Sequence, residues 1–256
     1  MTGTFAPAPG AASPARQVLT QAAMEARLML RNGEQLLLAV VIPLIVLVGA
    51  VRGADAVGLD LSLDGQSPID VLTPGVVALA VMSTSFTSLA IATGFERRYG
   101  LLKRLGTAPL SRGALLGGKV GALLVVELMQ LAVIAVAAVL LDWSPAVDVV
   151  GVLLATLLGT CAFAALGLLV AGTLRAEATL ALANLVYLLL MAGGGVVVPV
   201  SAYGGFGDVV RWLPSGALGE AMRTGFDGGI AWRDLAVLGV WAVVGSTAAA
   251  RWFRWE

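Results

Sequence analysis

The residues that could do chemistry gather in one run, Gly94–Lys119, which reads GFERRYGLLKRLGTAPLSRGALLGGK. This run holds six of the chain's sixteen basic residues and a single acid, Glu96. Long apolar runs flank it on both sides, so it predicts a polar loop between two membrane spans. The chemistry that these residues offer is ionic contact on whichever side of the membrane the loop faces.

Part of this run, Gly113–Lys119, matches the first half of a phosphate-binding P-loop, G-x-x-x-x-G-K. The next residue is Val120, where the motif requires a magnesium-binding hydroxyl, and a loop precedes the motif where a strand is required. We therefore reject nucleotide binding at this position, and no other polar segment is long enough for an ATPase domain. The spacing of Gly113, Gly117 and Gly121 instead favours close packing of one helix on another.

Glu127 is the only acid deep inside an apolar run. Because an ionisable group costs several kcal/mol within a bilayer, Glu127 is a candidate for contact with a polar or cationic substrate. A protonated or paired glutamate that serves only the structure is the alternative, and the sequence leaves both readings open. A single such group argues against a proton relay.

Two further polar patches lie in apolar runs. One is the hydroxyl-rich stretch Ser83–Ser88, and the other is the pair Asn184 and Tyr187, which are one helical turn apart. Hydroxyls can hydrogen-bond to their own helix, so both patches are compatible with packing or with a polar path. A triple glycine and then Val198 and Pro199 would loosen and end the fifth span, the apolar run that carries Asn184 and Tyr187, which makes Val198 and Pro199 the candidate outer gate. The pathway candidates are Thr84, Ser85, Ser88, Glu127, Asn184 and Tyr187.

The composition explains why polar residues stand out. The chain has 256 residues, of which 59% are apolar and 12% charged, about half the charge of a soluble domain. It has no histidine, and its one cysteine, Cys161, lies in an apolar run, which leaves no disulfide and no cluster with metal-ligand spacing. A net charge of zero gives no indication of nucleic-acid binding.

Apolar runs of about 20 residues match the thickness of a bilayer, so we predict an all-α polytopic membrane protein with six transmembrane helices. Residues 1–14 are predicted to be a disordered tail. Residues 15–34 contain an amphipathic helix that would lie in the membrane interface or pack on another subunit, and residues 35–256 form the transmembrane domain. The predicted spans are Gln35–Val51, Val71–Thr93, Ala114–Leu141, Asp148–Leu174, Thr179–Pro199 and Asp234–Ala250.

The stretch Asp208–Met222 is too polar and too short to span a membrane, and Pro214 and Gly216 are expected to break its helical parts. We predict a re-entrant pair of short helices before the last span, because irregular backbone is tolerated at membrane depth where protein covers it. An ordinary surface loop anchored by Trp212 is the alternative.

Basic residues predict the orientation, because they accumulate on the cytoplasmic side. With the Gly94–Lys119 loop inside, that side holds twelve of the sixteen basic residues and five acids, while the other side holds four basic residues and ten acids. Six spans place both ends of the chain on one side. Both termini are therefore predicted to be cytoplasmic.

This pattern resembles the membrane subunits of type-2 ATP-binding cassette (ABC-2) exporters, most closely the daunorubicin-resistance type of bacterial permease. The resemblance covers roughly residues 15–256, including the broken segment with Pro214 and Glu220. Its motif is an acid and bases, a glycine, a Leu-rich turn, a proline with a base, and then Gly-Lys. The matching residues are Glu96-Arg97-Arg98-Tyr99-Gly100, Leu101-Leu102-Lys103-Arg104-Leu105, Pro109-Leu110-Ser111-Arg112 and Gly118-Lys119.

The resemblance implies that Glu96–Pro109 forms a cytoplasmic coupling helix seated on a separate ATPase subunit, present in two copies. ATP and Mg would be used by that partner, and this chain would bind no cofactor. Two permease chains, identical or different, would pair in the bacterial cytoplasmic membrane with the pathway between their second and fifth spans. The substrate would be a hydrophobic or amphipathic compound such as a drug or lipid. The implied coupling residues are Glu96, Arg97, Arg98, Gly100, Lys103, Arg104, Leu105 and Pro109.

Two other functions compete with the exporter permease. A channel or secondary transporter would work without an ATPase, but it would need more intramembrane ionisable groups than Glu127. A membrane-embedded enzyme has neither a histidine nor a visible nucleophile–base pair to work with.

Overall fold

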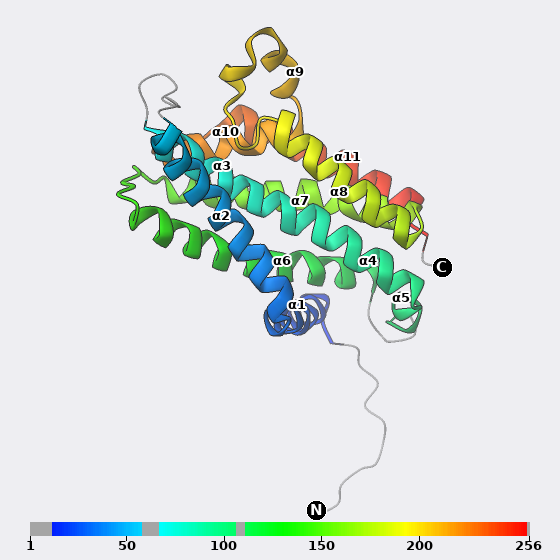
Figure 1. Ribbon diagram of the computed structural model, residues 1–256. Coiled ribbons are helices and arrows are strands. Elements are labelled where there is room, and N and C mark those ends of the chain that lie inside the picture. Colours follow the sequence, from blue (N-terminus) through cyan, green and yellow to red (C-terminus); the bar gives the residue numbers. More distant parts are fainter. Residues whose placement is uncertain (1–11, 58–66, 106–110, 255–256) are drawn as a thin grey trace, which may run out of the picture.

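The computed structural model describes residues 12–57, 67–105 and 111–254, and helix is the only regular secondary structure within these ranges. Five helical segments are long and apolar enough to cross a membrane, which confirms a polytopic membrane protein (Figure 1). They are Pro68–Arg98, built of α3 (Pro68–Met82), η1 (Ser83–Ser88) and α4 (Leu89–Arg98), then α6 (Arg112–Val139), α7 (Val149–Thr173), α8 (Ala176–Gly193) and α11 (Trp232–Trp252).

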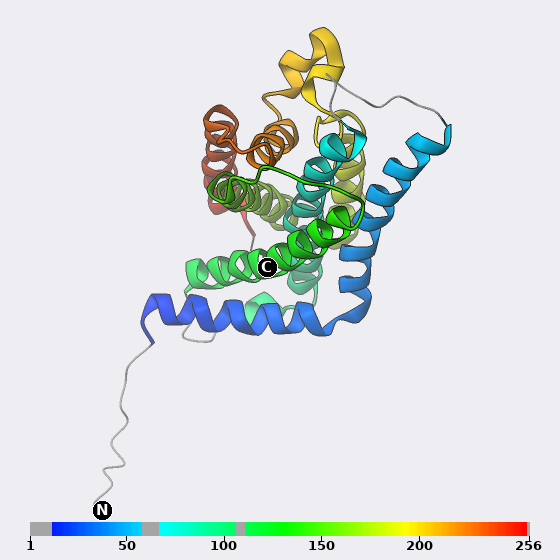
Figure 2. The ribbon, with the colours of Figure 1, turned by 90° about the vertical axis from the view of Figure 1, so that its left-hand side faces the viewer.

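The remaining predicted span, Gln35–Val51, lies within α2 (Gly33–Val57), whose described apolar stretch is the shorter Val40–Gly49. Pro43 lies inside this helix. Figure 2 shows α2 running from α1 along the bundle toward the end that carries α9. The structure thus gives five candidate spans, and the count of six stays a prediction.

The first helix, α1 (Pro14–Arg31), lies across α6 at one end of the bundle (Figure 2). The glycines of α6 allow this close approach. An added Cβ at Gly118 would lie 2.4 Å from Cγ of Gln21, and at Gly117 and Gly121 it would lie 3.5 and 3.0 Å from α1 side chains. At Gly113 it would meet open space. The predicted close helix packing is therefore confirmed at Gly117 and Gly121, and Gly118 rather than Gly113 is its tightest point.

Replacing Gly118 by valine should lower the free energy of unfolding by about 1–3 kcal/mol, the usual cost of overpacking. The nearest α1 atoms include the Cβ of Gln21 and the backbone nitrogen of Ala22, which cannot simply swing aside. Gly113→Val adds the same side chain to open space on the same helix and is the matched control. Thermal unfolding in mild detergent measures the difference, and equal losses for both variants would contradict the packing described here.

The second predicted span is longer than expected and changes its winding in the middle. The hydroxyl-rich stretch Ser83–Ser88 forms η1, a π-helical segment, and the helix then continues to Arg98. Glu96 to Arg98 therefore belong to this long helix rather than to a separate coupling helix. Of the rest of the predicted coupling segment, Leu101–Leu105 form α5, which follows a turn at Gly100 with φ +69°, and residues 106–109 lie outside the described residues.

The fifth predicted span is shorter than expected. Helix α8 ends at Gly193, and the chain bends through residues 194–199 into η2 (Val200–Phe206) and α9 (Gly207–Val210). Helix α10 (Pro214–Phe226) follows and packs on α3, α7 and α11. Pro214 is the first residue of α10, but Gly216 lies inside that helix, where its backbone is close to the carbonyl of Val210. Gly216 therefore allows close packing and does not break the helix.

Both described ends of the chain lie at the same end of the bundle. The backbone amide of Arg254, after α11, donates to the carbonyl of Gly172, which also accepts a hydrogen bond from Arg97 beside α5. Helix α1 packs on α6 and lies at this same end of the bundle (Figure 1). We call it the α5 end, and we call the opposite end, with η2, α9 and α10, the α9 end.

Candidate functional site

The α5 end contains a buried ionic triad drawn from three helices. Nζ of Lys119 on α6 lies 3.1 Å from Oε1 of Glu25 on α1 and 2.8 Å from Oε1 of Glu96 on α4. The Lys119 side chain is only 4% exposed. A buried ammonium is tolerated when it is paired, so the triad fixes α1 and α4 against the start of α6. The role of Lys119 was missed in the sequence, and Glu96 faces the interior of this chain.

Arg97 also points inward. One of its terminal nitrogens donates to the carbonyl of Gly172 at 2.6 Å, and the other donates to the carbonyl of Leu174. These carbonyls belong to the C-terminal end of α7, where a helix leaves its last carbonyls without partners and favours a positive charge. Arg97 therefore ties α4 to α7.

The outward residues at this end form a compact surface on and beside α5. Arg98 makes an ion pair with Glu177 at the start of α8, and both side chains are at least half exposed. Leu102 is buried and anchors α5 to the bundle. Of the other predicted coupling residues, Leu105 ends α5 and Pro109 lies outside the described residues. The exposed set, called the α5 surface below, is Arg98, Tyr99, Leu101, Lys103 and Arg104.

Tyr99 and Leu101 were not among the predicted coupling residues. Both are exposed beside Gly100, whose positive φ turns the chain from α4 into α5. A tyrosine and a leucine that face solvent within a basic loop could have been recognised from the Tyr99-Gly100-Leu101 sequence, because aromatic and apolar residues beside basic ones are common in interfaces.

The pathway candidates divide into two groups. Thr84 and Ser85 of η1 and Glu127 of α6 are buried inside this one chain. The hydroxyl of Thr84 donates to Gln130 at 3.1 Å, and the hydroxyl of Ser85 donates to the carbonyl of Val81 at 2.6 Å. The first contact joins η1 to α6, and the second lies within the long helix Pro68–Arg98.

Glu127 is 1% exposed, and one carboxylate oxygen accepts a hydrogen bond from Thr160 of α7. Its other oxygen has no partner in the described part of the chain. By contrast, Asn184 is on the exposed face of α8 and donates to the carbonyl of Leu180 at 2.9 Å. Tyr187 is half-buried and shares a hydrogen bond with Ser83, and Ser88 borders the Lys119 triad. The two polar patches therefore meet at Tyr187 and Ser83, whereas Asn184 faces outward and Thr84, Ser85 and Glu127 lie inside the bundle.

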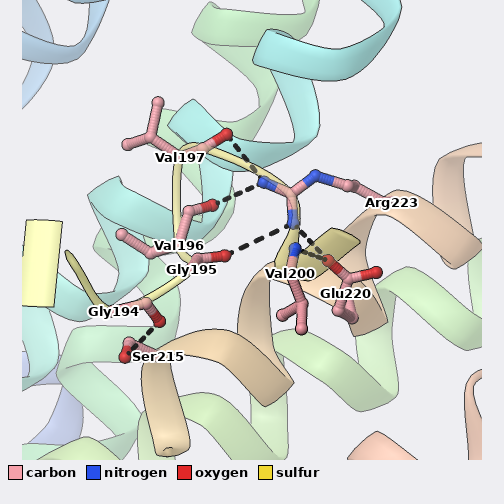
Figure 3. A network of polar contacts seen from close by, with 8 residues as sticks. All are labelled: Gly194, Gly195, Val196, Val197, Val200, Ser215, Glu220 and Arg223. Atoms are coloured by element: carbon pink, nitrogen blue, oxygen red, sulfur yellow. Dashed lines mark hydrogen bonds and ion pairs between the residues drawn. The ribbon is translucent and has the colours of Figure 1, made fainter. Parts of the chain in front are cut away.

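At the α9 end, Arg223 of α10 holds the bend that follows α8 (Figure 3). Its guanidinium donates to three successive backbone carbonyls, those of Gly195, Val196 and Val197, at 3.4, 2.9 and 2.7 Å. It also pairs with Glu220 at 3.0 Å, and Glu220 accepts the backbone amide of Val200 at 2.9 Å. The carbonyls of residues 195–197 lie outside any helix, and α10 provides hydrogen-bond donors for them.

A second contact completes this attachment. The hydroxyl of Ser215, at the start of α10, donates to the carbonyl of Gly194 at 2.7 Å (Figure 3). The candidate gate residues Val198 and Pro199 therefore lie on a segment held at both ends by α10. Pro199 also borders a polar cavity of about 460 Å³ that Asp70, Glu220 and Asp227 line.

These observations define a helical membrane protein with an exposed basic surface at one end and a polar cavity at the other. A family model described as ABC-2 type transporter matches residues 16–226. The chain therefore belongs to the ABC-2 type transporter family, and its membrane domain is the permease component of such a transporter. Permeases of this family generally work with a separate ATPase subunit. A comparison with curated proteins finds no match.

Proposed function

We propose that this chain is the permease of an ATP-driven exporter of the daunorubicin-resistance type. It moves a hydrophobic or amphipathic substrate, such as a drug or lipid, out across a bacterial cytoplasmic membrane. Two copies of a separate ATPase supply the energy. The observation that carries the proposal is the α5 surface, an exposed aromatic and basic patch at the end of the long Pro68–Arg98 helix in a chain of this family.

The α5 surface suits the transmission of movement. Lys119 and Arg97 attach α4 to α6, α1 and α7, so a push on α5 acts on a rigid group of helices. Glu96 and Arg97 are then positioning residues, whereas Tyr99, Leu101 and Lys103 contact the ATPase. Charged residues at such a contact mainly set its orientation, and the buried aromatic and apolar residues supply affinity.

In this proposal the α5 end is cytoplasmic and the α9 end faces outward. Helix α2 runs from one end toward the other in Figure 2, as a sixth span must. Helix α8 buries little of its surface and presents Asn184 beside exposed leucines, which suits contact with a second permease chain. The substrate pathway then runs between η1 and α8 of paired chains.

Charge reversal at Lys103 tests this function. Lys103→Glu should lower the ATPase activity that copurifies with the tagged permease by about tenfold or more, since a like charge opposes a complementary surface at the cost of a few kcal/mol. Thermal stability should not change, because Lys103 is exposed. The assay is vanadate-sensitive ATP hydrolysis after affinity purification in mild detergent.

Asp208→Lys, a charge reversal on the exposed face of α9, is the matched control and should leave that activity unchanged. Wild-type permease that brings no ATPase but still moves solute into liposomes along an ion gradient would contradict the proposal and establish the channel or secondary transporter.

A further inference from the structure

An apolar groove with a cationic edge lies on the outer surface of α11, near the α9 end. Its volume is about 260 Å³, and its walls come from the first turns of α11 and from the residue that links α9 to α10. It is separate from the α5 surface and from the cavity bordered by Pro199. The groove is lined by Trp212, Arg233, Ala236, Val237, Val240 and Trp241.

Two contacts position the tryptophans that line the groove. The indole nitrogen of Trp241 donates to the backbone carbonyl of Trp212 at 2.9 Å. The guanidinium of Arg233 lies 5.2 Å from the centre of the Trp212 ring, within range of a cation–π interaction. The floor along Val237 and Val240 is apolar. One end of the groove is therefore charged and aromatic, and the rest is hydrocarbon.

The position of the groove indicates what covers it. Helix α11 is one of the five candidate spans, and its outward residues Val240, Val243 and Val244 are more than half exposed in this chain. Trp232, at the first turn of α11, is 69% exposed, and tryptophan and arginine are enriched where membrane meets water. The groove thus begins at the headgroup level and descends along the hydrocarbon.

The positive charge at the Arg233 end of the groove favours binding of an anion. Arg211 and Arg233 both lie close enough to Asp234 to interact with it electrostatically, so these three groups carry a net single positive charge. Glu220, the other nearby acid, is already paired with Arg223. A basic pocket beside a spanning helix is the kind of site that binds an anionic lipid headgroup.

We propose that this groove binds one anionic phospholipid of the leaflet at the α9 end. The phosphate lies against Arg233 and Arg211, and one acyl chain occupies the floor along Val237 and Val240 between the two tryptophans. Because Trp212 connects α9 to α10, and α10 holds the bend after α8, the lipid also supports the candidate gate. This site does not depend on the ATPase partner.

The test uses the full chain in nanodiscs that contain phosphatidylcholine with or without phosphatidylglycerol. Phosphatidylglycerol should bind with at least about fivefold higher affinity than phosphatidylcholine, as measured by native mass spectrometry of retained lipid and by the rise in melting temperature. Arg233→Gln should weaken its binding by about tenfold, the change expected from losing one hydrogen bond to a charged group. Ala236→Phe should displace the acyl chain, since Ala236 is exposed in the groove.

Arg251→Gln, on the exposed face at the other end of α11, is the matched control and should bind phosphatidylglycerol normally. Equal retention of both lipids, or equal binding to wild type and the two groove variants, would overturn the site and leave only ordinary boundary lipid. Efficient cross-linking between two chains through a cysteine at position 236 would assign the groove to a second copy and would also overturn it.

Discussion

Lys119→Met should destabilise the protein by about 3–5 kcal/mol, the loss expected when one partner of a buried ion pair is removed. The substitution leaves the carboxylates of Glu25 and Glu96 around a site with no cation. Helix α1 should then separate from α6. Thermal unfolding in mild detergent measures the loss, and limited proteolysis between α1 and α2 reports the separation.

Two comparisons isolate the cause of this loss. Arg98→Gln removes one partner of the exposed pair with Glu177 and should cost less than about 1 kcal/mol. Adding Glu25→Gln and Glu96→Gln to Lys119→Met should recover much of the stability, because no buried charge then remains unpaired. A Lys119→Met variant as stable as Arg98→Gln would show that the triad does not hold the α5 end together.

Arg223→Met should cost about 2–4 kcal/mol and release the bend between α8 and η2. It removes hydrogen bonds to three backbone carbonyls, and the buried carbonyls left behind have no other described donor in this network. Hydrogen exchange of the amides in residues 194–200 should become faster, including that of Val200. Transport should fall as well if this bend is the outer gate.

Arg223→Lys keeps the charge but loses the planar fork that reaches several carbonyls, so it should recover only part of the stability. Arg175→Met, at an exposed arginine of the α5 end, should leave hydrogen exchange in the bend unchanged. Unaltered exchange in Arg223→Met would mean that α10 does not hold the bend.

The sequence predicted the elements well and their ends less well. Hydropathy located the long helices, and charge with amphipathic spacing located α1, because these signals depend on composition alone. The fifth span was extended to Pro199 because Val196 to Val198 are apolar, yet α8 ends at Gly193. The reason lies elsewhere in the chain. Arg223 and Ser215 donate hydrogen bonds to backbone carbonyls of the segment that follows α8, and Gly195 in that segment adopts a φ of +73°.

The site was harder to predict because its contacts join distant residues. Lys119 stood out only at the end of an imperfect P-loop motif and of the family's loop motif, and its carboxylate partners are on α1 and α4. Glu96 and Arg97 had the residue types of a docking surface, but the structure turns both inward. Periodicity cannot separate a charge that binds a partner protein from one that binds another helix of its own chain.

The central claim, that the α5 surface seats an ATPase subunit, is tested most directly by site-specific photocross-linking in cells. A benzophenone amino acid placed at Tyr99 should give an adduct whose mass identifies a Walker-type ATPase. The same probe at Phe206, which is also more than half exposed but lies at the α9 end, should give none. No ATPase adduct at position 99, or equal adducts at both positions, would contradict the account.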